Sequence, residues 1–345
     1  MDLIHSMLAG DRLALARLLT EAENLTPAGR QALDALFPHS GNAYLIGVTG
    51  APGTGKSTLV NRLALHFRGE QKRVAIVAVD PSSPFTGGAV LGDRVRMKDL
   101  SGDPGVFIRS MASRGSLGGL ARSTAAAVQL FDAAGYERIL IETVGAGQGE
   151  VDIARLAHTT LVVEAPGLGD DIQAIKAGIL EIADILVINK ADRPGVENTE
   201  KALKSMLDLA HPTRRVYLHH GRALSAEPPA AEDTSAWVPP IQKTVSTEGK
   251  GIPELAEQIA SHAAYLRATG GWAARDQARL ASETEIILQR TLMDQFRAGE
   301  AGTRYNEVLQ EVFRRSLSPW EAVARLTGQE PHTPGRAESQ PGRPQ

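Results

Sequence analysis

The sequence predicts an α/β protein with a doubly wound, mostly parallel β-sheet, an N-terminal helical extension and a C-terminal helical arm. Over residues 43–268, short apolar runs typical of buried strands alternate with segments that carry apolar residues at helical spacing. A glycine-rich octet at residues 50–57 separates the first such strand from the first such helix. From Trp272 to about Thr327, helical spacing is the only pattern left. These three observations predict one sheet domain followed by helices.

Helical segments are also expected before the first strand. Residues 3–23 carry leucines at helical spacing, interrupted by a Gly-Asp pair. Thr26 then has the character of an N-cap, and Pro27 fits the first position of a second helix, where its missing N–H is tolerated. Residues 1–40 are therefore expected to form a helical extension.

The octet reads Gly-Ala-Pro-Gly-Thr-Gly-Lys-Ser and fits the pattern of a phosphate-binding loop. Its glycines allow a tight turn that aims backbone N–H groups at phosphate oxygens, and the following helix adds the positive end of its dipole. Lys56 is predicted to reach the β- and γ-phosphates, and the Ser57 hydroxyl is predicted to bind Mg²⁺. The octet thus predicts a nucleoside triphosphate site, the alternative being a glycine-rich turn without a ligand.

A second motif, Asn189-Lys190-Ala191-Asp192, follows the apolar run at residues 185–188 and fits the pattern Asn-Lys-x-Asp. An ionised Asp192 can accept hydrogen bonds from N1–H and the 2-amino group of guanine, a pair of donors that adenine lacks. Hydrogen bonds to a charged group contribute about 1.5–3 kcal/mol, so losing them discriminates about ten- to a hundredfold. Lys190 can cover the base, and Asn189 can tie this segment to the phosphate loop. Taken alone the motif also fits a polar turn, but after a phosphate-binding loop it predicts guanine.

Acidic residues end two further strands, and they are expected to lie beside the phosphates. Residues 74–79 lead into Asp80, after which a loop runs to Asp93, and residues 138–141 lead into Glu142. Because the carboxyl ends of parallel strands meet at one sheet edge, these acids can hold Mg²⁺ or its water ligands. The alternative is that they cap helices or turns.

Glycines dominate the segment after Glu142, which reads Thr-Val-Gly-Ala-Gly-Gln-Gly-Glu. The Gly145 N–H is predicted to sense a γ-phosphate, and such glycine-rich loops are expected to change shape when that phosphate leaves. Gln148 lies where a side chain can orient the attacking water, although position in a loop does not by itself establish that role.

Four long runs carry a specific resemblance. They are residues 79–84, 87–94, 142–145 and 169–178. In these runs the sequence resembles the MeaB/ArgK/MMAA family of P-loop GTPases, and the resemblance extends from about residue 1 to about residue 328. It implies a homodimeric GTPase that acts as a chaperone for a cobalamin-dependent acyl-CoA mutase such as methylmalonyl-CoA mutase. The implied role is to gate delivery of adenosylcobalamin and to protect the mutase.

The resemblance also implies roles for single residues. Residues 167–176 correspond to a third mobile segment, and Lys176 is the candidate for carrying a signal to the partner, the alternative being a solvated lysine. The family has a small-residue run such as Ser-Ala-x before Gly-x-Gly-Ile, where this chain has Val-Ser-Thr, a change that backbone N–H contacts to guanine would survive. The implied GTP contacts are Gly50, Ala51, Pro52, Gly53, Thr54, Gly55, Lys56, Ser57, Thr58, Gly145, Asn189, Lys190, Asp192, Val245, Ser246 and Thr247. The expected metal ligands are Ser57, Asp80, Asp93 and Glu142, and the expected catalytic residues are Lys56, Asp93, Glu142 and Gln148.

Four segments are expected along the chain. They are the extension at residues 1–40, the GTPase domain at 41–268, a dimerisation arm at 269–328 and a disordered tail at 329–345. The arm carries apolar stripes between Leu280 and Phe296, which on spacing alone could pack on their own domain. The family resemblance favours a dimer contact.

Composition restricts the alternatives. The chain of 345 residues has no Cys, which excludes thiolate metal sites, and its nine His are scattered apart from His219 and His220. That pair is expected in a surface loop at residues 219–240. A net charge of −3 gives no electrostatic reason to expect nucleic acid. No apolar run reaches membrane-spanning length and the N-terminus does not resemble a presequence, so a cytoplasmic location is expected.

The favoured function is a Mg²⁺-dependent GTPase that chaperones a cobalamin-dependent acyl-CoA mutase. A nickel-insertion GTPase is the alternative, but such proteins usually carry Cys and His clusters. A small-molecule kinase is a third possibility, in which Asn-Lys-x-Asp would be out of place. The sequence lacks Asp-x-His-x-x-Gly, by which mutases take cobalamin, so the chain is not expected to be the mutase itself. Methylmalonyl-, isobutyryl- and ethylmalonyl-CoA mutases remain open as the client.

Overall fold

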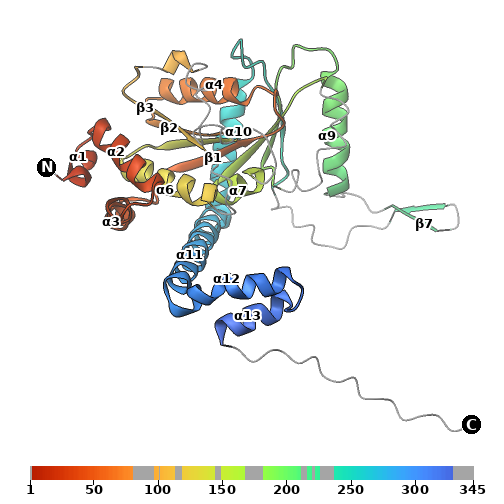
Figure 1. Ribbon diagram of the computed structural model, residues 1–345. Coiled ribbons are helices and arrows are strands. Elements are labelled where there is room, and N and C mark those ends of the chain that lie inside the picture. The colour runs from red at the N-terminus through yellow and green to blue at the C-terminus, as the bar shows by residue number, and fades with distance from the viewer. Residues whose placement is uncertain are drawn as a thin grey trace, which may run out of the picture. The chain divides into compact units, whose positions relative to one another are not determined.

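The computed structural model describes residues 2–80, 97–100, 102–112, 119–143, 149–167, 182–210, 216–219, 222–225 and 237–328. The chain forms two units, Met1–Ala281 and Ser282–Gln345. Figure 1 shows the sheet and its covering helices in the first unit, and helices in the described part of the second. The expected boundary between GTPase domain and arm, at residues 268 and 269, stays a prediction.

Seven parallel strands form the central sheet in the order β3-β2-β4-β1-β5-β6-β9, which confirms the predicted fold class. They are β1 (Tyr44–Thr49), β2 (Val74–Asp80), β3 (Val106–Ala112), β4 (Arg138–Thr143), β5 (Thr159–Glu164), β6 (Ile185–Ile188) and β9 (Ile241–Lys243). All six residues of β1 are buried, as expected for a strand covered on both faces. Since the strands are parallel, their carboxyl ends lie along one edge, where α/β proteins bind ligands.

Helices cover both faces of this sheet. One face packs against α4 (Lys56–Gly69) and α10 (Ile252–Thr269), and alternate residues such as Ile46 and Val48 point to it. The opposite face packs against α6 (Gly119–Ala133), α7 (Gly149–Leu156) and α9 (Val196–Ala210). A short 3₁₀ turn, η2 (Lys98–Leu100), contributes Leu100 to the α4 side. The octet is therefore held between the central strand and the first helix of a two-faced core.

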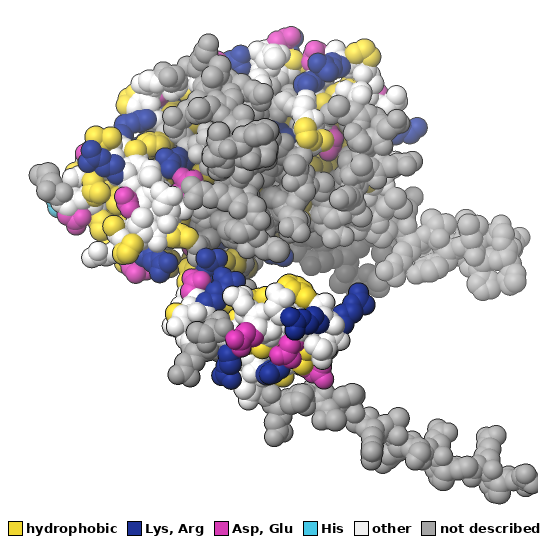
Figure 2. Space-filling model, viewed as in Figure 1, with side chains coloured by type: hydrophobic (Ala, Val, Ile, Leu, Met, Phe, Trp, Pro, Cys, Tyr) yellow, Lys and Arg dark blue, Asp and Glu magenta, His cyan; other side chains and the backbone are white. Residues whose placement is uncertain are grey.

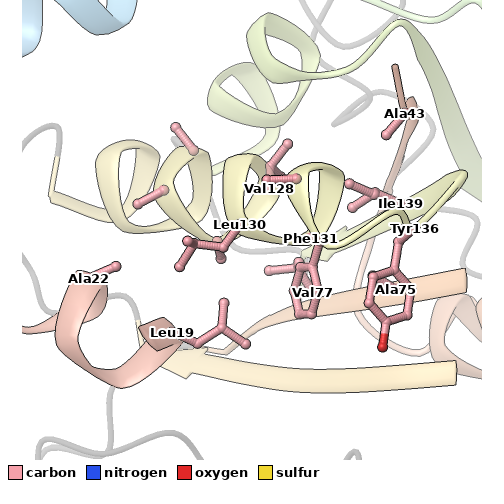
Figure 3. Packing of buried hydrophobic residues seen from close by; sticks show 14 of the residues in the cluster. Leu19, Ala22, Ala43, Ala75, Val77, Val128, Leu130, Phe131, Tyr136 and Ile139 are labelled. Carbon is pink, nitrogen blue, oxygen red and sulfur yellow. The ribbon is translucent and has the colours of Figure 1, made fainter. Parts of the chain in front are cut away.

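The N-terminal extension packs on the α6 side of the core. It contains α1 (Leu3–Leu8), α2 (Arg12–Glu23), α3 (Pro27–Leu36) and the 3₁₀ turn η1 (Phe37–His39). Figure 3 shows Leu19 and Ala22 of α2 facing the cluster that contains Leu130 and Phe131 of α6. Thr26 accepts a hydrogen bond from the Gly29 N–H at 3.0 Å and Pro27 opens α3, as the sequence predicts.

Hydrogen bonds from Arg12 and an ion pair of Glu23 join this extension to β3 and the residues just before it. The Arg12 guanidinium donates to the carbonyl of Pro104 at 2.6 Å and to that of Val106 at 2.7 Å. At the other end of α2, Glu23 pairs with Arg109 of β3 at 2.5 Å, and both side chains are largely buried. Arginine suits the first contact because its planar fork can serve two carbonyls.

A hairpin corrects part of the surface loop expected at residues 219–240. β7 (Val216–His219) pairs antiparallel with β8 (Arg222–Ser225), so His219 ends a strand and residues 222–225 form another. The β-prone Val216 and Tyr217 favour a first strand, and pairing with it supplies the partner that the second strand needs. His220 lies outside the described residues.

A buried polar cluster fastens the first turns of α11 (Gly271–Ala298) to the amino-terminal ends of the strands. Arg275 donates to both carboxylate oxygens of Asp184 at 2.7 Å, and to the His158 carbonyl at 2.6 Å. Asp276 lies 3.0 Å from Nε2 of His158, and Trp272 stacks on the His158 ring at 4.0 Å. The start of α11 thus belongs to the first unit.

The second unit is helical in its described part, as predicted. α12 (Glu300–Phe313) packs against α13 (Pro319–Thr327), burying Val308 and Ala322. Ser318 and Glu321 form a capping box at the start of α13. An apolar stripe on α11 is exposed, with side-chain exposures of 44–55% at Ile287, Leu288, Leu292 and Met293. None of the helices in the described ranges is long and apolar enough to cross a membrane.

Candidate nucleotide site

The phosphate-binding loop follows β1 and leads directly into α4, as the octet predicts. Gly50 and Gly55 have φ angles of 139° and 93°. A Cβ at Gly50 would lie 2.1 Å from the Val163 carbonyl oxygen, and one at Gly55 would lie 2.5 Å from the side-chain nitrogen of Asn189. Both positions therefore require glycine for conformation and for space. The result is a loop whose backbone passes close to β5 and to the Asn-Lys-x-Asp segment.

Lys56 lies across this loop. Its ammonium donates to the carbonyls of Gly50 at 2.8 Å and Ala51 at 3.0 Å, and the residue is 6% exposed. Lys56 is the first residue of α4, so its charge lies beside the N–H groups at the start of the helix. A cation and a helix N-terminus at one loop form an anion-binding arrangement.

Ser57 and Glu142 meet at the carboxyl ends of neighbouring strands. The Ser57 hydroxyl donates to a Glu142 carboxylate oxygen at 2.6 Å, and Glu142 is 4% exposed. β4 lies next to β1 in the sheet, which brings Glu142 beside the loop. Serine and carboxylate oxygens are the hard ligands that Mg²⁺ prefers, so this pair fits a Mg²⁺ site.

Other predicted site residues lie outside the described part of the chain. These are Asp93, Gly145, Gln148, Lys176 and the side chain of Asp80, whose backbone ends β2 at the same sheet edge. Within the described ranges, no group of three or more His, Asp and Glu side chains could hold a metal ion. The assignments for these residues stay predictions.

Asn189 joins the two halves of the predicted site. Its side-chain nitrogen donates to the Thr54 carbonyl at 2.8 Å, a contact between residues 135 positions apart. Its side-chain oxygen accepts from the Thr244 hydroxyl at 3.1 Å, and from the Ser246 N–H at 3.2 Å and hydroxyl at 2.7 Å. The Asn189 residue is 2% exposed, so its amide is fully used within the core.

Lys190 and Asp192 lie at the surface of the same segment. Lys190 has a φ of 56°, uncommon for a residue with a Cβ, and its ammonium donates to the Gly53 carbonyl at 2.5 Å. The Asp192 residue is exposed. The hydrogen bond that Lys250 donates to the Glu248 carboxylate, together with the charge of Asp192, raises the pKa of Lys250, so the two exposed segments also interact electrostatically.

The segment after β9 carries the remaining predicted contacts, Val245, Ser246 and Thr247. Its carbonyls are bound from α4 by Arg62, which donates to Ser246 at 3.0 Å and to Thr247 at 2.9 Å. Arg62 belongs to no recognised motif, so sequence reasoning did not identify it. Its only sequence signal is a charged residue between the apolar Val60 and Leu63 of a buried helix.

Several known proteins are similar to this chain in sequence and in fold. Residues 15–301 match the family described as methylmalonyl Co-A mutase-associated GTPase MeaB. A Pyrococcus abyssi protein described as a GTPase is 43% identical over 322 residues, which cover 93% of this chain and 94% of that protein. The GTPase ArgK of Escherichia coli K12 is 34% identical over 332 residues, covering 94% of each chain. The crystal structure of an LAO/AO transport system kinase matches with a TM-score of 0.67 and 27% identity, covering 94% of this chain and 95% of that one.

Proposed function

The chain belongs to the MeaB family of methylmalonyl-CoA mutase-associated GTPases, and we propose that it is a Mg²⁺-dependent chaperone of a cobalamin-dependent acyl-CoA mutase. In this proposal, GTP binding and hydrolysis gate the delivery of adenosylcobalamin and protect the mutase. The observation that carries the nucleotide site is the hydrogen bonding of Asn189, which links the phosphate loop to the segments that would read the base. The family description supports the choice of partner.

Lys56 is proposed to neutralise the β- and γ-phosphate oxygens. Its ammonium lies on the carbonyls of Gly50 and Ala51, so a rotation of a flexible side chain would carry it to phosphates bound in the loop. Backbone N–H groups of the loop and of the first turn of α4 would bind the remaining oxygens. These groups stabilise negative charge as it shifts between the phosphates during hydrolysis.

Ser57 and Glu142 are proposed to hold Mg²⁺, together with Asp80 and Asp93. The Ser57 hydroxyl donates to Glu142, which leaves the lone pairs of the serine oxygen available to a cation. When bound, Mg²⁺ neutralises charge on the β- and γ-phosphate oxygens. Gly145 is proposed to bind a γ-phosphate oxygen through its N–H, and Gln148 to orient the attacking water.

Lys176 is proposed to couple the nucleotide state to the mutase. Binding at two sites is linked reciprocally, so a mutase that prefers the GTP-bound state raises GTP affinity by the same factor. The proposal also includes a homodimer formed through residues 269–328. A nickel-insertion function has no comparable support, because the chain has no Cys and belongs to the MeaB family.

The test measures GTP hydrolysis and adenosylcobalamin transfer with and without the cognate mutase. Wild type is expected to change both rates when the mutase is added, and to bind GTP about fivefold or more tightly, the usual size of an equilibrium coupling between two sites. Lys176→Ala is expected to keep its basal rate and lose most of that change. Lys56→Ala is expected to abolish hydrolysis and thus gives the background rate.

Lys201→Ala provides the matched control, because Lys201 is an exposed lysine on α9. It is expected to respond to the mutase as wild type does. A mutase that leaves both the hydrolysis rate and cobalamin transfer unchanged would contradict the chaperone function. A Lys176→Ala protein that responds like wild type would contradict only the coupling role.

A further inference from the structure

The last two residues of β4 are hydrogen-bonded to the two ends of the phosphate-binding loop. Glu142 accepts from the Ser57 hydroxyl at 2.6 Å, and Ser57 is the last residue of the octet. The Thr143 hydroxyl donates to the Thr49 hydroxyl oxygen at 3.1 Å, and Thr49 ends β1 directly before the octet. The end of β4 is therefore joined to the loop at both of its ends.

These two hydrogen bonds lie on opposite faces of the sheet. Successive side chains of a strand point to opposite faces, and in β4 Leu140 belongs to the core on the α4 side while Ile141 belongs to the core on the α6 side. Glu142 therefore points to the α4 side and Thr143 to the α6 side. Because each bond restrains one face, the end of β4 cannot tilt towards either face without lengthening one of them.

Burial and strand register show where the Thr143 hydrogen bond acts. Thr49 and Thr143 are 0% and 4% exposed, so water does not compete for their hydroxyls. The paired positions of β1 and β4 end at Val48 and Glu142. The side chain of Thr143 thus joins the two strands one residue beyond the paired positions, at the point where β4 ends.

We propose that Thr143 is a positioning residue for GTP hydrolysis, which keeps the Glu142 carboxylate beside the Ser57 oxygen when Mg²⁺ is bound. The inference rests on the proposed Mg²⁺ site, and Thr143 itself contacts neither the nucleotide nor the metal. Threonine suits this role because its branched side chain is stiff at χ1, so its hydroxyl keeps one direction. Mg²⁺ demands near-ideal octahedral geometry, so a small displacement of an oxygen that holds it or one of its water ligands weakens its binding.

The test separates Mg²⁺-dependent from Mg²⁺-independent nucleotide binding in Thr143→Val, which keeps the shape of the side chain and removes its hydroxyl. Titration calorimetry measures the affinity for a non-hydrolysable GTP analogue with Mg²⁺ and with EDTA. The gain in affinity on adding Mg²⁺ is expected to fall about two- to tenfold, the range of a single hydrogen bond, while the affinity in EDTA stays the same. In hydrolysis assays kcat is expected to fall by a similar factor, and the KM for GTP at saturating Mg²⁺ is expected to stay near the wild-type value.

Further variants show whether the hydrogen bond itself is responsible. Thr143→Ser keeps a hydroxyl and is expected to recover most of the Mg²⁺-dependent gain. Thr49→Val removes the other partner and is expected to cause the same loss, with no further loss in the double variant. It also decides the matter if Thr143→Val does not unfold cooperatively.

Thr124→Val is the matched control. Thr124 lies on α6 and is 1% exposed, and its hydroxyl has no hydrogen-bond partner in the described ranges. The substitution therefore removes a buried hydroxyl of the same kind without breaking a hydrogen bond. It is expected to keep the wild-type kinetics and the wild-type gain in affinity with Mg²⁺.

The outcomes separate this inference from the site on which it rests. A wild type whose nucleotide affinity and hydrolysis do not depend on Mg²⁺ would overturn the Mg²⁺ site. A Mg²⁺-dependent wild type with an unchanged gain in Thr143→Val, or in Thr49→Val where the first variant is unfolded, would overturn the role of Thr143. Equal losses with Mg²⁺ and with EDTA would also overturn it, because the bond would then stabilise the loop as a whole. Additive losses in the double variant would overturn it as well, since the two threonines would then act separately.

Discussion

The buried side-chain amide of Asn189 links the phosphate loop to the segment after β9 by hydrogen bonds. It donates to the phosphate loop and accepts three hydrogen bonds from the residues that follow β9. Because it is buried, replacing it with an apolar residue would leave several polar groups without partners, at about 1–3 kcal/mol for each. Its contacts therefore stabilise the first unit and the nucleotide site together.

At Asp192 we predict a change of base preference. In Asp192→Asn, the amide can donate to the extra oxygen of xanthine but cannot accept from both guanine donors. GTP affinity is expected to fall about ten- to a hundredfold, while xanthosine triphosphate becomes the preferred ligand. Equilibrium titration with both nucleotides measures this. Asp208→Asn, at an exposed acid on α9, is the control, and unchanged preference at Asp192→Asn would mean that another group reads the base.

Site residues that belong to a ligand-binding motif could be predicted from the sequence. Residues that act by holding other parts of the site in place could not. The glycine-rich octet and Asn-Lys-x-Asp each have spacing set by a ligand, and the structure brings their described members together through Asn189. Arg62 acts through two backbone carbonyls, which any sequence provides, so only the three-dimensional approach of α4 to the loop reveals it. The sequence also could not indicate that the Ser246 N–H is already bound.

Among the elements, α10 and α11 meet the sheet through buried histidines. His262 of α10 donates to or accepts from the Thr159 hydroxyl at 2.7 Å and lies 3.3 Å from Asp184. Burial lowers the pKa of His262 to about 4, although the charge of Asp184 acts in the opposite direction. Burial also lowers the pKa of His158, whose hydrogen bond to Asp276 opposes the shift. In both side chains, burial thus favours the neutral imidazole in the folded protein.

We predict that this cluster makes stability depend on pH between about 6.5 and 4. Unfolded histidine binds a proton near pH 6.5, whereas folded His262 does not until the pH approaches 4, so the unfolded state gains protons first. Its contribution is complete above pH 6.5 and is lost as the pH falls towards 4. Melting temperatures at pH 7, 6 and 5 measure the slope, which His262→Gln should flatten. His39→Gln, at an exposed site, should keep the wild-type slope.

The periodicity of apolar residues predicted whether a segment is a helix or a strand more securely than it predicted where the segment begins and ends. The strands of the sheet and the helices of the arm appear where spacing predicts them, because each buries a face with its own period. The sequence predicts a loop at residues 222–225, but the structure has a strand there. Its pairing depends on a partner strand that the local sequence does not specify.

For the whole molecule, the position of Arg275 matters most. It belongs to α11 and pairs with Asp184 before β6, so cutting the chain after residue 268 would leave a buried carboxylate without its arginine partner. The division between units falls at Ala281, beyond this cluster. Periodicity could identify the arm but not this boundary, since helical spacing continues through α11 without a break.

On the face shown in Figure 2, acidic and basic side chains of the described residues are intermixed, which does not resemble a nucleic-acid-binding stripe.

We predict that the exposed stripe of α11 holds the proposed dimer. Leu288 and Leu292 are four residues apart and thus on one helical face, and they are 54% and 55% exposed. Leu288→Glu with Leu292→Glu is expected to give a monomer that still binds GTP, because charges cannot be buried cheaply in an apolar contact. Light scattering measures the mass. Gln289→Glu should leave the mass unchanged, and a doubly substituted protein that stays dimeric would place the interface elsewhere.

The two contacts between α2 and β3 have a consequence for how the protein behaves while it is being made. Among the described strands, β3 ends the sheet, and an uncovered edge strand can recruit strands from other chains. Arg12 occupies carbonyls at the start of β3 and Glu23 holds Arg109 within it, so the extension shields this edge and the adjoining α6 surface. Because the extension is synthesised before β3, it is available to cover this edge when the sheet and α6 form. A chain that began at residue 41 would therefore be prone to aggregate even though its nucleotide site is intact.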